Sequence, residues 1–439
     1  MKKFMILAAV AMLVGRASAA VRDTISLNAG WQFHLGELSG IEAVKNAKSE
    51  RVNLPHDFLI GQPWVEPDAS ERPDNSDAGS NVRSRLSPRG FKEMNVGWYR
   101  YVLTPKAEWK GRRVVLDFQG IMLVGDVWLN GKHIGKTDYG YLGFDTDISS
   151  ILKYDGDNEI IVKANTQQPN NSRWYTGGGL YRDVNLIVTD KKLYFPRHPL
   201  FIRTENNKKV KIQAEIACFN KVDNIPAEVK IYDANGEVVA QKKQNIVFNG
   251  KWRTREYELQ TIEIDNANLW SCESPYLYTA EVTLFDNQGN VVDQIREQFG
   301  VRTIEFSPNF GFKLNGKKVL LKGYANHHTL GALGAAAYPR AIEKRIQLMK
   351  SFGYNHIRTS HNPYSEDFMR LCDRYGILVV DELYDKWLTQ YAGGRVEWEA
   401  LWQRDVPEWV KRDRNHPCVV LWSLGNELQQ YPNLPFNDW

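Results

Sequence analysis

The sequence predicts two β-sandwich domains followed by a region in which strands and helices alternate. Up to about residue 305, short runs of alternating apolar and polar residues are broken by turn residues, a pattern typical of antiparallel sheets. After about residue 306, apolar residues recur at helical spacing between short apolar strands, which predicts parallel strands covered by helices. The length of 439 residues also fits about three domains.

The start of the chain has the features of a secretory signal peptide over residues 1–19. Lys2 and Lys3 form a basic start, residues 4–14 are apolar but too few to span a bilayer, and residues 17–19 are small, as at a cleavage site. We therefore expect an exported protein, periplasmic or secreted. No other stretch approaches the length of a transmembrane helix, so we expect no membrane span.

Charge and cysteine content exclude several functional classes. The formal net charge is +4, and most of that positive charge lies in the expected leader. The mature chain is therefore nearly neutral and lacks the basic surface that binds nucleic acids or anionic membranes. The 4 cysteines form no CxxC pair, so we expect buried free thiols rather than a zinc site or a disulfide framework. They are Cys218, Cys272, Cys372 and Cys418.

Residues 21–190 predict the first sandwich, of jelly-roll type. The segments "VGWYRYVLTP", "RRVVLDFQGI" and "DVWLNGKHIG" alternate as strands do. In the last of them, Asn130-Gly131 tolerates positive φ at both positions, which indicates a type I′ hairpin. Residues 191–305 repeat the pattern, with Asn235-Gly236 at another hairpin, and predict a smaller, immunoglobulin-like sandwich.

Residues 306–439 predict the α/β part. A short buried strand in "KKVLLKGYA" is followed by a helix that begins near Pro339, a favoured first-turn residue. "NHIRTS" predicts the second strand, and Ser365 caps the next helix, which ends at Gly376. "ILVVDE" predicts the third strand. A helical region that is bent or broken at Pro407 precedes the fourth strand, in "CVVLWSLGNE".

Polar residues at the end of each predicted strand favour a barrel over an open doubly wound sheet. These residues are 326–328, 358–362, 381–382 and 426–427. In a (β/α)8 TIM barrel the carboxyl ends of all strands meet at one mouth, where active sites lie. No GxGxxG follows the first strand, so dinucleotide binding loses support. We therefore expect the first half of such a barrel, with a site built from these residues.

Glu427 is the leading candidate for catalysis. It stands at the end of an apolar strand, where we expect the carboxylate to be partly desolvated. Desolvation raises the pKa of a carboxyl group toward that needed by a general acid near neutral pH. The alternative is a strand-end Glu that caps a turn or pairs with an Arg, and position alone does not decide between them.

Several segments resemble glycoside hydrolase family 2, which includes β-galactosidases, β-glucuronidases and β-mannosidases. "NHPCVVLWSLGNE" is similar to the acid/base segment of that family. "IRTSHNPYSEDFMRLCDRYGILVVDE" and "LLKGYANHHTLGALGAA" resemble its upstream barrel segments, and "GWYRYVLTP" and "RWYTGGGLYRDV" resemble its amino-terminal sugar-binding domain. The segments follow the family's domain order along essentially the whole mature chain.

The resemblance implies a retaining mechanism in which Glu427 is the general acid/base. Asn426 would hydrogen-bond the sugar 2-hydroxyl, and Arg358 would lie under the nucleophile and keep it ionised. His327 and His361 would line the subsite of the scissile sugar. The alternatives are structural: an ion pair in the barrel interior for Arg358, and hydrogen-bonded strand-end residues for the two histidines.

The loop "NSRWYTGGG" is a further candidate part of the site. Arg173 and Trp174 would reach the site from the first domain, as this loop does in relatives, or would only form a Gly-rich turn.

We expect no cofactor and no metal. A site formed by His327, His328 and His361 is weighed lower, because no HxH or HExxH spacing is present and because His328 would point the other way along its strand. Some family members bind magnesium through an acid shortly after the third strand, and Lys386 stands at that place here.

The second carboxylate of the reaction is the missing part. A retaining site needs two carboxylates about 5–5.5 Å apart, and the resemblance places the nucleophile on a later strand of the barrel. Glu382 has a comparable place on the third strand but does not match the nucleophile motif. We therefore expect the amino-terminal part of a longer enzyme, inactive alone, whose full-length form could be a homo-oligomer.

Three hypotheses of function follow. The first is an exported retaining β-glycosidase that acts on oligo- or polysaccharides or other β-glycosides. It would be β-galactosidase-like because of "GALGAA", with β-glucuronidase or β-mannosidase as alternatives in the same family. The second is a non-catalytic carbohydrate-binding protein. The third is a metal-dependent hydrolase built on the three histidines.

Overall fold

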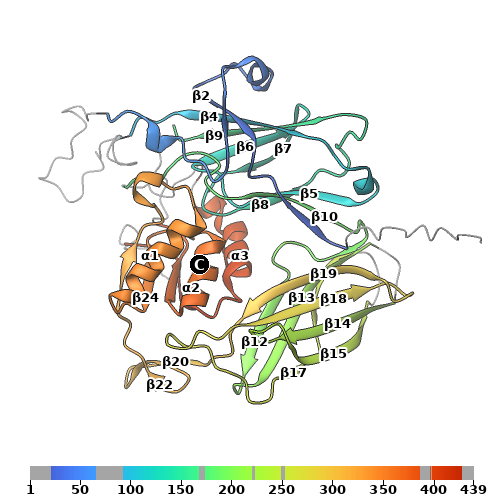
Figure 1. Cartoon of the computed structure of the whole chain (residues 1–439), viewed down its shortest axis with the longest axis vertical. Coiled ribbons are helices and arrows are strands. Elements are labelled where there is room, and N and C mark those ends of the chain that lie inside the picture. Colours follow the sequence, from blue (N-terminus) through green and yellow to red (C-terminus); the bar gives the residue numbers. More distant parts are fainter. Residues whose placement is uncertain are drawn as a thin grey trace, which may run out of the picture.

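The computed structural model describes residues 21–65, 92–167, 174–219, 223–248, 253–385, 396 and 398–427. The expected leader, Arg173 and Lys386 lie outside this range. The described chain forms two sandwiches and an α/β part that contacts both of them (Figure 1). The two sandwiches followed by barrel strands confirm the fold class predicted from the sequence.

The first sandwich packs a 4-stranded sheet, in the order β1-β10-β5-β8, on a 6-stranded sheet, β3-β2-β4-β9-β6-β7. All pairings are antiparallel. The strands are β1 (Asp23–Ser26), β2 (Trp31–Leu35), β3 (Glu50–Val52), β4 (Val96–Leu103), β5 (Arg113–Phe118), β6 (Val124–Leu129), β7 (Lys132–Thr137), β8 (Phe144–Asp147), β9 (Asn158–Asn165) and β10 (Val184–Thr189). Among the described residues between these strands, 3₁₀ turns lie at Ile41–Asn46, Leu59–Gly61 and Ala107–Trp109.

The predicted hairpin at Asn130-Gly131 is present between β6 and β7. Both residues have positive φ, 51° at Asn130 and 82° at Gly131, as a type I′ turn requires. The sandwich core is formed by inward-facing aromatic and aliphatic side chains such as Trp31, Tyr99 and Phe118, which are fully buried.

The second sandwich has one sheet in the order β11-β13-β12, with β16 and β17 also paired to β13, and a second sheet in the order β15-β14-β18-β19. Its strands are β11 (Leu193–Tyr194), β12 (Leu200–Glu205), β13 (Lys209–Cys218), β14 (Asn224–Tyr232), β15 (Val238–Val247), β16 (Arg253–Glu258), β17 (Ile262–Glu263), β18 (Tyr278–Phe285) and β19 (Val291–Phe299). The turn at Asn235-Gly236 joins β14 to β15, as predicted.

A small antiparallel sheet connects the second sandwich to the α/β part. It consists of β20 (Ile304–Ser307), β21 (Gly311–Leu314) and β22 (Lys317–Lys318).

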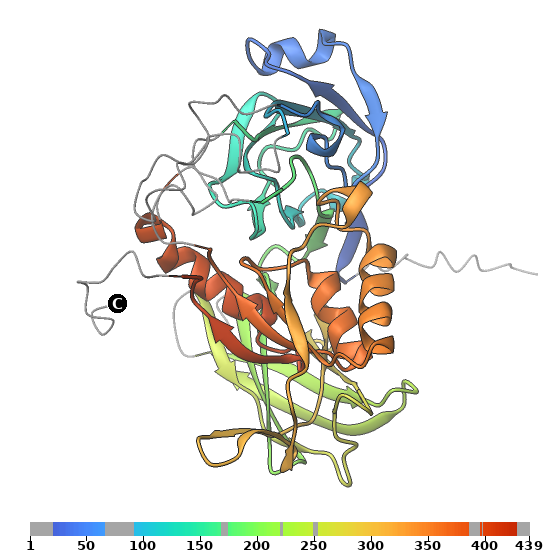
Figure 2. The same ribbon diagram turned by 90° about the vertical axis from the view of Figure 1, so that its left-hand side faces the viewer.

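The α/β part is a 4-stranded parallel sheet in the order β23-β24-β25-β26, covered by helices on one side (Figure 2). The elements are β23 (Gly323–Asn326), a 3₁₀ turn (Gly331–Leu333), α1 (Pro339–Ser351), β24 (His356–Thr359), α2 (Glu366–Tyr375), β25 (Leu378–Glu382), a 3₁₀ turn (Trp398–Ala400), α3 (Trp402–Asp413) and β26 (Val419–Ser423). Strands in chain order pair as neighbours, as at the start of a barrel.

The helix boundaries follow the predicted signals. The Ser365 hydroxyl accepts a hydrogen bond from the backbone N–H of Phe368 at 3.3 Å, and Gly376 ends α2 in the left-handed conformation at φ 68°. All four cysteines are buried free thiols, as expected.

One expectation for the α/β part is wrong, and a second is wrong in part. The strand after residue 317 is not buried, because β23 is an edge strand and Gly323, Tyr324 and Ala325 are exposed. Of the bend or break expected at Pro407, the break is absent, because the helix continues through the proline inside α3. Beyond the proline, Trp409 and Arg412 are buried, and this packing offsets the hydrogen bond that a proline removes.

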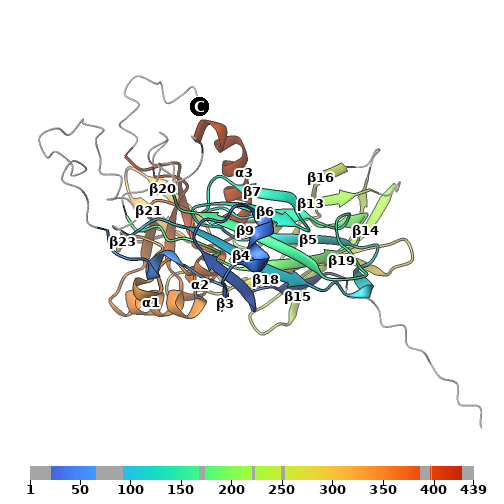
Figure 3. The same cartoon turned by 90° about the horizontal axis from the view of Figure 1, so that it is seen from above.

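The first sandwich and the α/β part share a buried cluster of apolar side chains. Met122, Tyr139, Tyr141 and Tyr181 belong to the sandwich, and residues 383–384 and Trp409 belong to the α/β part. This arrangement brings the sandwich loops over the carboxyl ends of the parallel strands (Figures 1 and 3). Among the described helices, none has the length and apolar character needed to cross a bilayer.

Candidate active site

The buried carboxylate of Glu382 organises the carboxyl ends of the parallel strands. Arg358 on β24 donates to it twice, from Nε to Oε2 at 2.8 Å and from Nη2 to Oε1 at 3.0 Å. Nδ1 of His361 lies 2.6 Å from Oε1, and the hydroxyl of Ser423 on β26 donates to Oε2 at 2.8 Å. The Glu382 side chain has no exposed surface, so its charge is compensated by these donors.

Alternation along the strands accounts for this arrangement. On β24, Ile357 packs into the core beneath the helices, so its neighbour Arg358 lies on the opposite side of the sheet. Glu382 pairs in register with Ser423, which places the two side chains on that same side. The side of the sheet opposite the helices therefore carries the polar site.

Asn426 is held in the same network. Its Oδ1 accepts from Arg358 Nη2 at 3.0 Å, and its Nδ2 donates to Oδ1 of Asp385 at 2.9 Å. The backbone N–H of Asn426 donates to the carbonyl of Asp385 at 2.8 Å. Both ends of the amide and its backbone N–H are thus held by hydrogen bonds just after β26.

Three aromatic rings stand beside this network, and one of them comes from the first sandwich. Trp174 lies with its ring centroid 4.4 Å from that of His327 and 5.2 Å from that of His361. The two histidine rings are 5.8 Å apart at an interplanar angle of 88°. The structure therefore brings together His327, His361, Arg358 and Asn426, as the sequence analysis expected for the subsite. Trp174 joins them from the first sandwich, which was one of the two alternatives for its loop.

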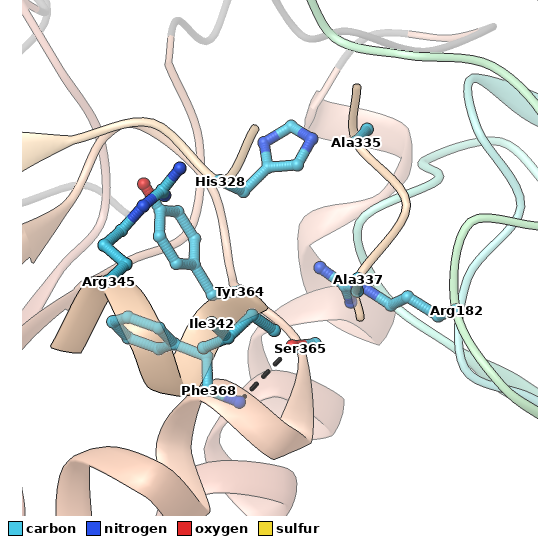
Figure 4. A pocket seen from close by; sticks show the side chains of 9 residues that line it. All are labelled: Arg182, His328, Ala335, Ala337, Ile342, Arg345, Tyr364, Ser365 and Phe368. Carbon is cyan, nitrogen blue, oxygen red and sulfur yellow. Dashed lines mark hydrogen bonds between the residues drawn. The ribbon is translucent and has the colours of Figure 1, made fainter. Parts of the chain in front are cut away.

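His328 points away from this cluster, as the alternation of side chains predicts. Its Nε2 lies 3.2 Å from the carbonyl of Thr176, and its ring contacts Tyr141 and Tyr181. Burial lowers the pKa of His328 to about 3, so the ring is neutral. It lines a cavity of about 20 Å³ together with Arg345 and Tyr364, which is room for one water molecule (Figure 4).

No group of three or more His, Cys, Asp or Glu side chains in the described part of the chain is placed to hold a metal ion. The three histidines of the alternative hydrolase hypothesis are divided, because His328 lies in a different environment from His327 and His361.

Glu427 follows Asn426 directly, in a left-handed conformation at φ 49°. The expected desolvation of this carboxylate is wrong for the described chain, because Glu427 is exposed. The reason is its position: β26 is the edge strand of the 4-stranded sheet, and no other described strand lies beyond it.

Arg358 shows the arrangement that was the alternative in the sequence analysis, an ion pair inside the sheet, with its Nη2 2.7 Å from Oε2 of Glu382. Arg173 lies outside the described residues.

Ser423 and Asp385 were not identified from the sequence, although both are polar residues close to a strand end. The strand-end pattern that identified Glu382 and Asn426 would have found them if it had been extended by three residues.

Three sequence models of one family match the chain. The model described as glycosyl hydrolase 2 galactose-binding domain-like matches residues 91–181. The model of glycosyl hydrolases family 2 matches residues 198–302, and that of the family's TIM barrel domain matches residues 309–434.

Known proteins resemble the chain over nearly its full length. A β-galactosidase of Bacteroides ovatus is 32% identical, over 93% of this chain and 47% of that protein. A β-glucuronidase of Bacteroides fragilis is 27% identical, over 95% of this chain and 58% of that protein. The solved structure of a glycosyl hydrolase family 2 member from Bacteroides cellulosilyticus is 34% identical with a TM-score of 0.82, and the match covers 92% of this chain and 52% of that one. The chain thus spans about half the length of these relatives.

Proposed function

Because the chain belongs to glycoside hydrolase family 2, we propose that it serves in the retaining hydrolysis of terminal β-linked sugars and carries the acid/base half of the site. The observation that carries the proposal is the cluster in which Asn426, which precedes Glu427, shares hydrogen bonds with Arg358 and Asp385. The expected leader supports export of the protein.

Glu427 is the proposed acid/base. It would protonate the leaving oxygen and then take a proton from the incoming water. Asn426 would hydrogen-bond the sugar 2-hydroxyl, a contact that strengthens in the transition state. Since Asp385 and Arg358 hold the two ends of this amide, it meets the sugar in one orientation.

Trp174, His327 and His361 are proposed to bind the sugar ring. The indole face suits the apolar C–H face of a pyranose, and the imidazoles offer polar atoms to its hydroxyls. A galactoside is the preferred substrate, which the β-galactosidase of Bacteroides ovatus supports. A glucuronide is the alternative, supported by the β-glucuronidase of Bacteroides fragilis.

The second carboxylate is proposed to come from barrel strands beyond the 4 that the structure describes. Glu382 is a poor nucleophile, because both of its oxygens already accept hydrogen bonds from Arg358, His361 or Ser423. We therefore expect no turnover of an aryl β-galactoside by this polypeptide alone.

The test is to join the chain in frame, after residue 427, to the remaining barrel of the Bacteroides ovatus relative. The chimera should hydrolyse an aryl β-galactoside faster than the matching glucuronide. Glu427→Gln should lower kcat by about 10²–10⁴-fold, the usual contribution of a general acid/base. Unchanged turnover in this variant would refute the role of Glu427.

The non-catalytic hypothesis gives a different result in the same material. Sugar binding to the full chain, measured by calorimetry, would then persist while every chimera stays inactive. The full chain is needed for this measurement, because a fragment ending near residue 305 would expose the side chains of Tyr139, Tyr141 and Tyr181 that pack on the α/β part. Metal analysis of the purified protein tests the third hypothesis.

A further inference from the structure

We infer that Asp57 is a positioning residue for the sugar subsite, because it ties the loop that carries Trp174 to the barrel loop that follows His327. The inference rests on the proposed function. Asp57 lies in the first sandwich, between β3 and the 3₁₀ turn at Leu59–Gly61, and is only 6% exposed. It is distant in sequence from all the residues of the site that were identified above.

The Asp57 carboxylate accepts hydrogen bonds from three separate segments. Oδ1 accepts from the backbone N–H groups of Leu59 and Gly178, both at 2.9 Å. Oδ2 accepts from the Tyr175 hydroxyl at 2.6 Å and from the backbone N–H of Ala335 at 2.7 Å. Backbone N–H groups can only donate, so an acceptor-only carboxylate is the side chain that satisfies all four donors.

The backbone has closed onto this carboxylate from two sides. A Cβ at Gly334 would lie 2.2 Å from Oδ2 of Asp57, and a Cβ at Gly177 would lie 2.9 Å from the same atom and 2.3 Å from Cβ of Ala335. Both glycines also have positive φ, 63° at Gly334 and 86° at Gly177. Only glycine fits either position. The backbones of the two loops are therefore packed directly against the Asp57 carboxylate.

Each of the two loops leads directly into the subsite. Trp174 immediately precedes Tyr175, and its ring lies 4.4 Å from that of His327. The barrel loop that contains Ala335 begins after β23, at the paired histidines, and His328 is held by the carbonyl of Thr176. Fixing the two loops to one carboxylate therefore fixes the indole against the imidazoles, and a sugar bound beside these rings needs less ordering of them on binding.

The experiment compares Asp57→Asn with Asp117→Asn in the full chain. Asp117 is a matched control: it lies on β5 of the same sandwich, is 7% exposed and pairs with Arg197 at 2.9 Å, on no segment that Asp57 contacts. Chains labelled with 5-fluorotryptophan give a ¹⁹F resonance for Trp174, assigned with Trp174→Phe. Hydrogen exchange is followed in peptides that cover residues 174–181 and 331–337.

In Asp57→Asn we expect the Trp174 resonance to move and broaden, exchange in both peptides to rise at least about tenfold, and the affinity for galactose or glucuronate to fall by a similar factor, or about 1.4 kcal/mol. Asp117→Asn should leave the resonance and the two peptides unchanged. If Asp57→Asn does not fold, Tyr175→Phe removes one of the four bonds and should produce the same changes at smaller size.

Two outcomes separate this inference from the proposed function. An unchanged Trp174 resonance with unchanged exchange in Asp57→Asn would overturn the positioning role, whatever sugar binds. If the unsubstituted chain binds neither sugar but Asp57→Asn still displaces Trp174, the proposed function fails and the positioning of Trp174 by Asp57 stands.

Discussion

At the scale of single residues, Glu382 shows how a charge is kept inside the sheet. Arg358 shields one side of the carboxylate while a third of its own side chain remains exposed, and His361 and Ser423 occupy the other positions around it. A buried carboxylate is stable only when its donors are all present. Glu382 is therefore an anchor for the residues around it.

Glu382→Gln should destabilise the chain by about 3 kcal/mol, since removing one partner of a buried ion pair leaves the other uncompensated. Urea denaturation gives the free energy of unfolding. Glu408→Gln is the control, because the Glu408 side chain is 41% exposed and lies 3.6 Å from Arg197, so its loss should cost less than about 1 kcal/mol. Equal losses in the two variants would show that the Glu382 network contributes no more than a surface pair.

Residues of the site could be predicted where a local rule applied. Alternation along a strand distinguished His327 from His328, and the strand-end rule found Arg358, Glu382 and Asn426. The same rule failed for the exposure of Glu427, because exposure depends on which element lies beyond the strand. Asp57 could not be found, since the partners that matter for the site, Gly178 and Ala335, lie on loops more than 100 residues away.

At the scale of elements, the contact of α2 with the segment before β26 includes a buried ion pair. His416 Nδ1 lies 2.5 Å from Oδ2 of Asp373, near the end of α2, and Asp373 Oδ1 accepts from the backbone N–H of Cys418 at 2.9 Å. Burial alone would lower the pKa of His416, but the adjacent carboxylate outweighs burial and raises the pKa to about 9.

The stability of the chain should consequently depend on pH through His416. Because its pKa rises on folding from the ordinary value of 6.5 to about 9, the contribution is complete below about pH 6.5 and is lost as the pH rises through 9. Melting temperatures measured from pH 6 to 10 should fall more steeply for the unsubstituted chain than for His416→Gln. Parallel curves would show that the pair is not charged in the folded state.

The order and type of the elements in the α/β part could be predicted, since the helices have apolar residues at helical spacing and α2 also has a Ser365 cap and a Gly376 end. The burial of β23 could not, because an apolar strand gives no sign of whether it is central or at an edge. That α3 continues through Pro407 could not be predicted from the local sequence either, because the burial of Trp409 beyond the proline stabilises the helix there.

At the scale of the whole molecule, the edge at β26 is unusually apolar. Leu421 and Trp422 are 39% and 41% exposed, and Leu424 is 51% exposed. Trp422 contacts Trp409 of α3 at a centroid distance of 4.7 Å, so it lies on the helix side and Leu421 on the site side. Apolar side chains are therefore exposed on both faces of the sheet beside this edge.

An open apolar edge promotes association. We expect the purified chain to self-associate with rising concentration in sedimentation velocity, and the double variant Leu421→Ser and Leu424→Ser to weaken this association at least about tenfold. Val238→Ser is the control, since Val238 is 47% exposed on the second sandwich. A weakening of the same size in Val238→Ser would mean that association does not depend on the β26 edge.

The two sandwiches could be predicted from turn spacing, but the way in which the first one packs on the α/β part could not. The tyrosines at 139, 141 and 181 read as ordinary strand or loop residues, and only the assembled structure brings them against residues 383–384 and Trp409. Such contacts depend on the complementary shapes of two surfaces that are far apart in the sequence, and hydrophobic periodicity within one segment does not predict them.

The packing of the first sandwich on the α/β part constrains how the two parts can evolve. The Tyr139 hydroxyl donates to the carbonyl of Leu383, and Arg182 donates to the carbonyl of Pro363 at 2.8 Å, so each surface is complementary to the other in detail. A substitution on one surface is tolerated only with an adjustment on the other. Recombination that exchanged the sandwich alone between distant lineages would break this match, and the two parts should have been inherited together.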